Sequence, residues 1–294
     1  MALLYSITHT TTYLYHEQVS LCHNIAMLSP RNTDTQICSS SNIIITPLPE
    51  VLESHIDFFG NKAIYFVVEQ EHDTLSVTVT SLIEKTATLT DKPISTISWE
   101  AVKDMLQSST GQYIAEKQFI AETDMTAPTI AISNYAAESF TPGQSLFKAV
   151  YHLMQRIYSD FEFTPGFTTI STPLSTVMKE RKGVCQDFAH LGISCMHAMG
   201  LPAKYVSGYI ETLAPEGKEK LSGVDASHAW FSVFIPGTGW IDFDPTNNKI
   251  PDEQYITVGW GRDYFDIVPL KGVIMSSSPH EMKVSVDVRR VAAL

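Results

Sequence analysis

Basic residues are scarce in this sequence. Twenty Lys and Arg stand against 32 Asp and Glu in 294 residues, so the formal net charge is −12. Surfaces that bind nucleic acid or anionic lipid need clustered positive charge, and the composition argues against both kinds of partner. No stretch approaches the roughly 18 uninterrupted apolar residues of a membrane helix. We therefore expect no nucleic-acid partner and no membrane association, while the oligomeric state stays open.

Cysteine is also sparse. Four cysteines in a chain of this length do not make a disulfide framework, and no Cys-x-x-Cys pair supports a zinc site: Cys22, Cys38, Cys185 and Cys195. No Asp-x-Asp-x-Asp-Gly pattern suggests a calcium loop. Residues 1–6 lack the basic and apolar segments of a signal peptide. These absences predict a cytoplasmic protein with reduced thiols, no metal and no cofactor.

The first part of the chain has the pattern of β-structure. In residues 5–15 the odd positions are mostly aromatic or β-branched and most even positions are Ser or Thr, which is typical of a half-buried strand. Gly60-Asn61 suits a turn with positive φ. Further strands are predicted at 42–46, 62–68 and 74–83. We predict an antiparallel, sandwich-like β-domain over residues 1–90.

The pattern then changes from strands to helices. Residues 91–140 are irregular and are predicted to form a connecting region with one or two short helices. Thr141-Pro142-Gly143-Gln144 has the sequence of a capping box with proline at the first helical position, so a helix should begin there. Two more helices are predicted at 172–181 and 185–199, followed by strands at 204–212, 227–234, 240–243 and 282–290. This order predicts an α+β architecture whose core, residues 141–294, packs helices on an antiparallel sheet.

Cys185 is predicted to lie at the start of a helix, directly after Gly183. Free N–H groups and the positive end of the helix dipole stabilise a thiolate there, and the same N–H groups can bind an oxyanion. A lone cysteine is nevertheless more often an inert core residue. Position alone therefore does not identify a nucleophile.

His228 and Asp244 belong to two neighbouring predicted strands. A five-residue loop at 235–239 would pair Phe234 with Trp240, and this register puts His228 and Asp244 on the same face as diagonal neighbours. A four-residue loop would put them on opposite faces. The hairpin thus permits a Cys–His–Asp constellation, with Asp242 as the rival carboxylate because it shares the face of Asp244.

Five ordered blocks resemble the nucleophile, histidine and aspartate segments of bacterial transglutaminase-like proteins. They cover residues 183–190, 200–203, 205–209, 228–230 and 239–247. The N-terminal third, including Asp57-x-x-Gly60-Asn61, resembles the β-domain that often precedes this core in bacteria, and residues 261–273 fit the same group. The resemblance implies a papain-like fold, with the nucleophile on a helix and its partners on adjacent strands.

The resemblance also implies a mechanism. Cys185 would attack the amide carbonyl of a peptide or protein and form a thioester acyl-enzyme. His228 would act as acid and base, and Asp244 would orient its imidazole. Lys179 stands where papain-like proteases supply a Gln oxyanion donor, so the Cys185 N–H is the expected donor. Further substrate or oxyanion candidates are Gln186, Trp230, Trp240, Tyr209 and Arg262.

Several residues near the expected site have simpler interpretations. Asp187 is expected to cap its helix and His190 to be structural, while Arg262 and Asp263 are expected either to line the cleft or to form an ion pair. A metal site made of the triad residues is disfavoured, because it lacks a second Cys or His at metal spacing. Hydrolysis of peptide or isopeptide bonds is the leading function. Protein-glutamine cross-linking and a non-catalytic binding module that keeps the fold are the alternatives.

Overall fold

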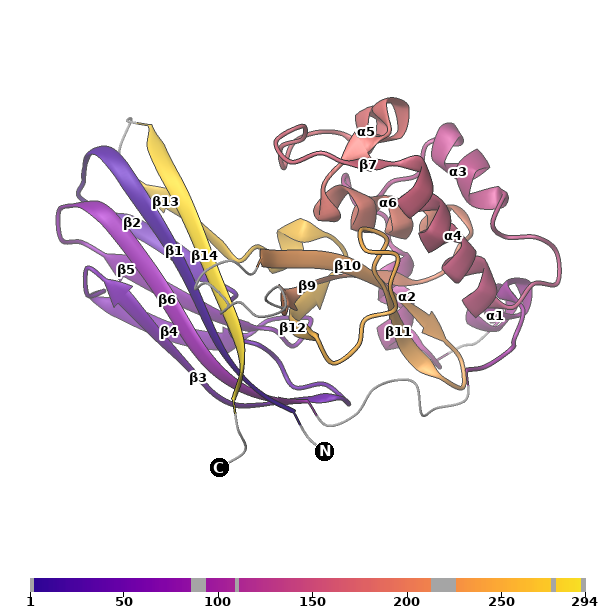
Figure 1. Ribbon diagram of the computed structural model, residues 1–294, viewed down its shortest axis with the longest axis horizontal. Helices are drawn as coiled ribbons and strands as arrows, with labels where there is room; N and C mark the ends of the chain where they lie inside the picture. Colours follow the sequence, from indigo (N-terminus) through magenta and orange to yellow (C-terminus); the bar gives the residue numbers. More distant parts are fainter. Residues whose placement is uncertain (1–2, 86–93, 109–110, 213–225, 276–278, 292–294) are drawn as a thin grey trace, which may run out of the picture.

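The computed structural model describes residues 3–85, 94–108, 111–212, 226–275 and 279–291. An N-terminal β-sandwich stands beside a core in which helices cover one face of a four-stranded sheet (Figure 1). The α+β class expected from the sequence is thereby confirmed. No helix within the described residues is long and apolar enough to cross a membrane.

The sandwich consists of two antiparallel sheets. Their strand orders are β14-β1-β6-β3 and β13-β2-β5-β4. The strands are β1 (Leu3–Val19), β2 (Cys22–Ala26), β3 (Gln36–Thr46), β4 (Val51–Ile56), β5 (Lys62–Val68), β6 (His72–Lys85), β13 (Leu270–Ile274) and β14 (His280–Val291). Burial along β1 alternates as predicted, since Tyr5, Ile7, His9 and Thr11 are buried while the residues between them are only partly covered. Gly60 has the expected positive φ, 80°, in the turn before β5.

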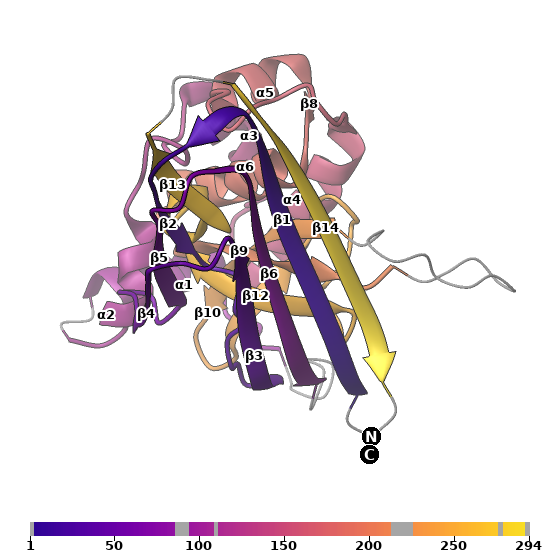
Figure 2. The ribbon, with the colours of Figure 1, turned by 90° about the vertical axis from the view of Figure 1, so that its left-hand side faces the viewer.

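The last two strands differ from the predicted domain boundary. Residues 141–294 were expected to form one core, yet β13 pairs with β2 and β14 pairs with β1 along its whole length. Figure 2 shows β14 lying alongside β1, with both chain ends at the same side of the sandwich. Val286 and Val288 are buried there against Tyr5 and Ile7. The chain therefore returns to the N-terminal domain after the core, and β14 covers the edge of β1 that would otherwise be unpaired.

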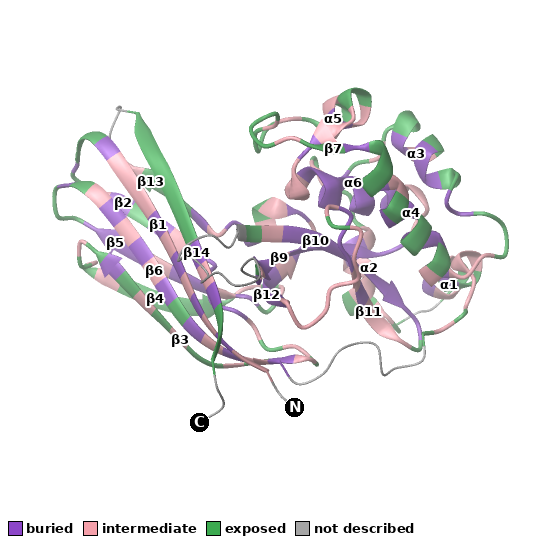
Figure 3. Cartoon of the chain, viewed as in Figure 1, coloured by how far each residue is buried: buried purple, intermediate pink, exposed green. Residues whose placement is uncertain are grey.

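The core sheet has the order β11-β10-β9-β12. Its strands are β9 (Ala203–Ile210), β10 (Ala226–Ile235), β11 (Gly239–Phe243) and β12 (Tyr255–Gly261). β10 is interior, as predicted, and is buried along most of its length (Figure 3). Ala229, Phe231 and Val233 pack in the main hydrophobic core with the helices, whereas Trp230 belongs to a smaller cluster on the other face.

The helical layer is formed by α1 (Trp99–Ser108), α2 (Ile114–Lys117), α3 (Ile130–Ala137), α4 (Leu146–Asp160), α5 (Leu174–Glu180) and α6 (Cys185–Ala198), with 3-10 turns η2 (Gln118–Ile120) and η3 (Tyr264–Ile267). A short parallel pair, β7 (Glu162–Phe163) and β8 (Lys182–Gly183), precedes α6. Ile132, Tyr135 and Ala136 of α3 are buried in the same core as α4 and α6. The region predicted as a connection is therefore part of the core.

The start of α4 lies later than the capping pattern indicated. Gly143 has a φ of 75°, which a helix does not allow, and the backbone N–H of Gln144 bonds back to Thr141 in a turn. The Thr141 hydroxyl does contact Gln144, at 2.8 Å, but through its side chain. Residues 141–144 thus form a turn, and the helix begins at Leu146.

Candidate active site

Cys185 is the first residue of α6, as predicted. Val184 caps the helix in an extended conformation, and the Asp187 carboxylate accepts the Val184 N–H at 2.8 Å and the Thr168 hydroxyl at 2.6 Å. A side chain at position 183 would collide with that carboxylate, because a Cβ there would lie 2.9 Å from it. Asp187 therefore has the capping role expected of it. The first N–H groups of the helix have no partner within the helix itself and can serve an incoming oxygen.

Cys185 differs from the buried cysteines in its exposure. It is partly accessible, whereas Cys22 and Cys195 are buried. Burial raises the pKa of Cys195 to about 12 and raises that of Cys22 as well. These two thiols are therefore neutral and unreactive at ordinary pH.

His228 and Asp244 meet across the hairpin of β10 and β11. Phe234 pairs with Trp240 in the predicted register, and the pairing continues to Phe231 opposite Phe243. Asp244 follows directly, and its Oδ2 lies 2.8 Å from Nε2 of His228. The rival carboxylate, Asp242, instead lies on β11 opposite Ser232.

Asp244 is held by a dense set of donors. The Tyr255 hydroxyl and the Asn247 side-chain amide each donate to Oδ2 at 2.7 Å, and the backbone N–H groups of Thr246 and Asn247 donate to Oδ1 at 2.9 and 3.3 Å. Burial opposes ionisation of this carboxyl, but these donors and His228 outweigh it and lower the pKa of Asp244. The carboxylate is thus a fixed anion behind the imidazole.

The imidazole of His228 has two neighbours of opposite chemical role. Burial disfavours its charged form, but hydrogen bonds to Asp244 and Cys185 and their negative charge raise the pKa of His228 to about 10. Because Nε2 is engaged by Asp244, Nδ1 is the ring nitrogen left for the thiol. The Trp230 indole stacks on the ring with centroids 6.1 Å apart. This arrangement favours an imidazolium that faces the side chain of Cys185.

The structure separates the other candidates. Gln186 follows Cys185 in the first turn, and Trp230 supports His228 from a fully buried position. Trp240 lies against Lys204, whose Nζ is 4.3 Å from the ring centroid. Arg262 forms an ion pair, as one of the two alternatives predicted, but its partner is Asp266 at 2.9 Å and not Asp263.

Tyr209 does not lie at the candidate site. It is buried in the contact between the core sheet and the sandwich, where its hydroxyl is 3.0 Å from Nδ1 of His9. Lys179 is exposed and contacts Glu180. Neither residue can supply the missing oxyanion donor.

His190 is structural, as expected. Its Nε2 accepts the backbone N–H of Tyr264 at 3.1 Å, its ring stacks on Tyr205, and burial lowers its pKa to about 3. Tyr205 itself was missed by the sequence analysis. Its buried ring belongs to the main hydrophobic core, against which Cys185 packs, and burial and then the charge of Cys185 raise the pKa of its phenol. Tyr255 was missed too, because β12 was not predicted.

The described residues contain no group of three or more His, Cys, Asp or Glu side chains arranged to hold a metal ion. What they do bring together is a partly exposed thiol at a helix start, an imidazole and a buried carboxylate. These are the parts of a nucleophile, a proton carrier and its orienter.

Comparisons with known proteins cover both domains. Residues 5–84 match the family described as "bacterial transglutaminase-like N-terminal region", and residues 133–245 match the "transglutaminase-like superfamily". An uncharacterized protein of Mycobacterium tuberculosis is 39% identical over 293 residues, covering 97% of this chain and 92% of the relative. A protein-glutamine gamma-glutamyltransferase of Pseudomonas aeruginosa is 34% identical over 73 residues, covering 24% of this chain and 11% of that protein.

A solved structure has the same fold. It is the crystal structure of a candidate cysteine protease from Cytophaga hutchinsonii, with a TM-score of 0.77 and 22% identity, and the match covers 100% of this chain and 92% of that one. The two-domain fold therefore also occurs in a protein of Cytophaga hutchinsonii.

Proposed function

This chain belongs to the transglutaminase-like superfamily, and from that premise we propose that it hydrolyses peptide or isopeptide bonds with Cys185 as the nucleophile. The observation that carries the proposal is the 2.8 Å contact between His228 and Asp244, together with the interaction of His228 with the Cys185 side chain. Superfamily membership supports thiol-dependent catalysis in general. The particular bond and the roles of the three residues are our inference.

The proposed reaction begins with the thiolate of Cys185 attacking the carbonyl carbon of an amide. The developing oxyanion would be stabilised by N–H groups at the start of α6, those of Cys185 and Gln186, which lie at the positive end of the helix dipole. The imidazolium of His228 then gives its proton to the leaving amine, and a thioester remains on Cys185. Asp244 keeps the ring oriented throughout.

Water completes the cycle. The neutral imidazole left after the first step takes a proton from water, which attacks the thioester and releases the acid. An amine bound in place of water would instead give transamidation. The Pseudomonas relative makes acyl transfer the second candidate, although it aligns with only 24% of this chain. Hydrolysis is preferred because water competes for any acyl-enzyme whose amine acceptor is not bound well.

A paired screen tests the proposal. A fluorogenic peptide library and a Gln-containing peptide offered with a fluorescent alkylamine are incubated with the wild type, Cys185→Ala and Cys38→Ser. Cys38 is the matched control because it is the other partly exposed cysteine. We expect turnover by the wild type and Cys38→Ser and none by Cys185→Ala. Activity that survives in Cys185→Ala would overturn the role of Cys185 as the nucleophile. No activity of the wild type with any substrate would favour the non-catalytic binding module instead.

A further inference from the structure

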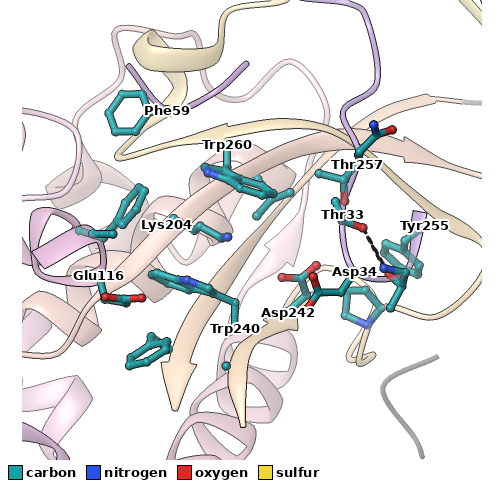
Figure 4. Close-up of a pocket in the computed structure, with 18 of the residues that line it drawn as sticks. Thr33, Asp34, Phe59, Glu116, Lys204, Trp240, Asp242, Tyr255, Thr257 and Trp260 are labelled. Atoms are coloured by element: carbon teal, nitrogen blue, oxygen red, sulfur yellow. Dashed lines mark hydrogen bonds between the residues drawn. The ribbon is translucent and has the colours of Figure 1, made fainter. Parts of the chain in front are cut away.

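A cavity of about 680 Å³ lies between the two domains, away from Cys185. Its walls come from sandwich loops around residues 32–35 and 58–59, from the α2–η2 segment, and from strands β9, β11 and β12 of the core sheet. Figure 4 shows the side chains that converge on it. A concave site of this size is in the range of pockets that bind small molecules.

Lys204 is the unusual member of this wall. It is only 4% exposed, and its Nζ lies 3.6 Å from the ring centroid of Trp260 and 4.3 Å from that of Trp240. Within the described part of the chain its ammonium has no hydrogen bond or ion pair, and in Figure 4 it lies among the side chains that line the cavity. The two aromatic faces offset part of the cost of removing this cation from water. The N–H groups that do not face a ring still lack a hydrogen-bond acceptor. A buried donor of this kind calls for an acceptor.

Burial is the main influence on this amine. It lowers the pKa of Lys204 to about 7. The negative charge of Asp242 acts in the opposite direction, and the positive charge of Arg31 lowers the pKa further. An anion on Lys204 would favour its charged form. Binding of an anionic acceptor should therefore raise the pKa of Lys204.

Carboxylates line the rest of the cavity. Asp34, Glu116, Asp242 and Asp252 all contribute, and the negative charges of Asp242, Asp34 and Glu116 all act on Lys204. The second lysine, Lys85, differs from Lys204 because its Nζ already donates one hydrogen bond, to the Tyr255 carbonyl at 2.8 Å. One buried amine without a hydrogen bond in the described structure therefore shares the cavity with four carboxylates that are at least partly exposed.

The two tryptophan rings beside Lys204 do not offer free faces for a stacked ligand. Trp260 has Lys204 against it and the Arg31 guanidinium 3.3 Å from its centroid. Trp240 contacts Lys204, Phe119 and Phe234. Recognition in this cavity must therefore come mainly from charge, with the ligand's anion toward Lys204 and its cation toward the carboxylates.

We propose that this cavity binds a short zwitterionic peptide, with its terminal carboxylate on Lys204 and its terminal ammonium facing Asp34 and Asp242. None of these three residues belongs to the proposed catalytic triad. The cavity does border the catalytic centre, because Tyr255 lines it and donates a hydrogen bond to Asp244. Binding of a peptide here nevertheless does not depend on the catalytic proposal.

The test uses the full chain carrying Cys185→Ala, so that no probe is consumed. Trialanine with free termini, its C-terminal amide and its N-acetyl form are titrated by calorimetry, with tryptophan fluorescence as a second readout because Trp240 and Trp260 flank Lys204. We expect saturable binding of the free peptide and at least about tenfold weaker binding of the amide, since a charge-assisted contact is lost. Lys204→Met should remove the difference between acid and amide, while the exposed Lys148→Met should keep it.

Equal affinity for the acid and the amide, or no saturable binding of any probe, would overturn the proposal and leave the cavity filled with water. This comparison needs no substitution at Lys204, so it stands even if Lys204→Met fails to fold. Asp242→Asn gives a second check. It should narrow the gap between the free and N-acetylated peptides, and an unchanged gap would contradict the proposed orientation.

Discussion

Replacement of Asp244 by Asn removes the charge that holds His228 in its cationic form. Burial alone would lower the pKa of this histidine below its ordinary 6.5, whereas the interactions with Asp244 and Cys185 raise it to about 10. The difference between 6.5 and about 10 corresponds to a free-energy preference on the order of 5 kcal/mol for the imidazolium, to which Asp244 and Cys185 both contribute. Asn keeps the volume of the side chain but not its charge. The pKa of His228 should therefore fall markedly in Asp244→Asn.

The consequences of Asp244→Asn can be measured in two ways. An NMR titration of ¹⁵N-labelled histidine follows the pKa of His228, and turnover of the best library peptide follows catalysis, where we expect a loss of about 10²–10⁴-fold in kcat/KM from the misplaced tautomer. Asp242→Asn, two residues earlier in the chain, is the matched control and should leave the pKa of His228 unchanged. An unchanged His228 pKa in Asp244→Asn, or a larger change in Asp242→Asn, would refute this reasoning.

Three more changes test the surrounding structure. Tyr255→Phe removes the 2.7 Å hydrogen bond to Asp244 and should lower kcat/KM about tenfold, whereas Tyr209→Phe, which loses its contact with His9, should leave kcat/KM unchanged in the same assay. Gly208→Ala would place a Cβ against the Ile256 carbonyl oxygen and 2.5 Å from the Trp230 ring, so it should destabilise the protein by more than about 3 kcal/mol in urea unfolding. A loss under about 1 kcal/mol would contradict the packing. His190 is neutral in the fold with a pKa of about 3, so below pH 6.5 the unfolded chain takes up a proton that the folded chain does not, and stability falls by up to about 1.4 kcal/mol per pH unit. His190→Gln, which keeps an acceptor for Tyr264, should make the decline of the urea midpoint between pH 6.5 and 4 shallower, and an unchanged decline would show that His190 does not contribute.

The sequence was most informative where short-range patterns determine geometry. The alternation of β1 and the helix start at Cys185 follow from local periodicity and turn residues. The hairpin of β10 and β11 could be placed in register because its loop length sets which faces His228 and Asp244 share. A capping pattern was misleading at residues 141–144, because the positive φ of Gly143 makes a turn of the same residues.

Non-local contacts left no such pattern. Leu4 pairs with Val291, almost a whole chain length away, and nothing near either residue indicates the partnership. Tyr255 reaches Asp244 from a strand whose residues gave no clear period. Tyr209 was chosen because it lies in a block near the nucleophile, but the strand continues past the site to the sandwich, so its side chain contacts His9 instead.

The most direct test of the account is the pH dependence of alkylation at each cysteine, measured by mass spectrometry with iodoacetamide. Burial raises the pKa of Cys22, Cys38 and Cys195, while Cys185 lies beside a cationic His228. The account predicts that Cys185 reacts far faster than the other three at pH 6 and that His228→Ala abolishes this preference. Slow and equal labelling of all four cysteines at pH 6 would contradict it.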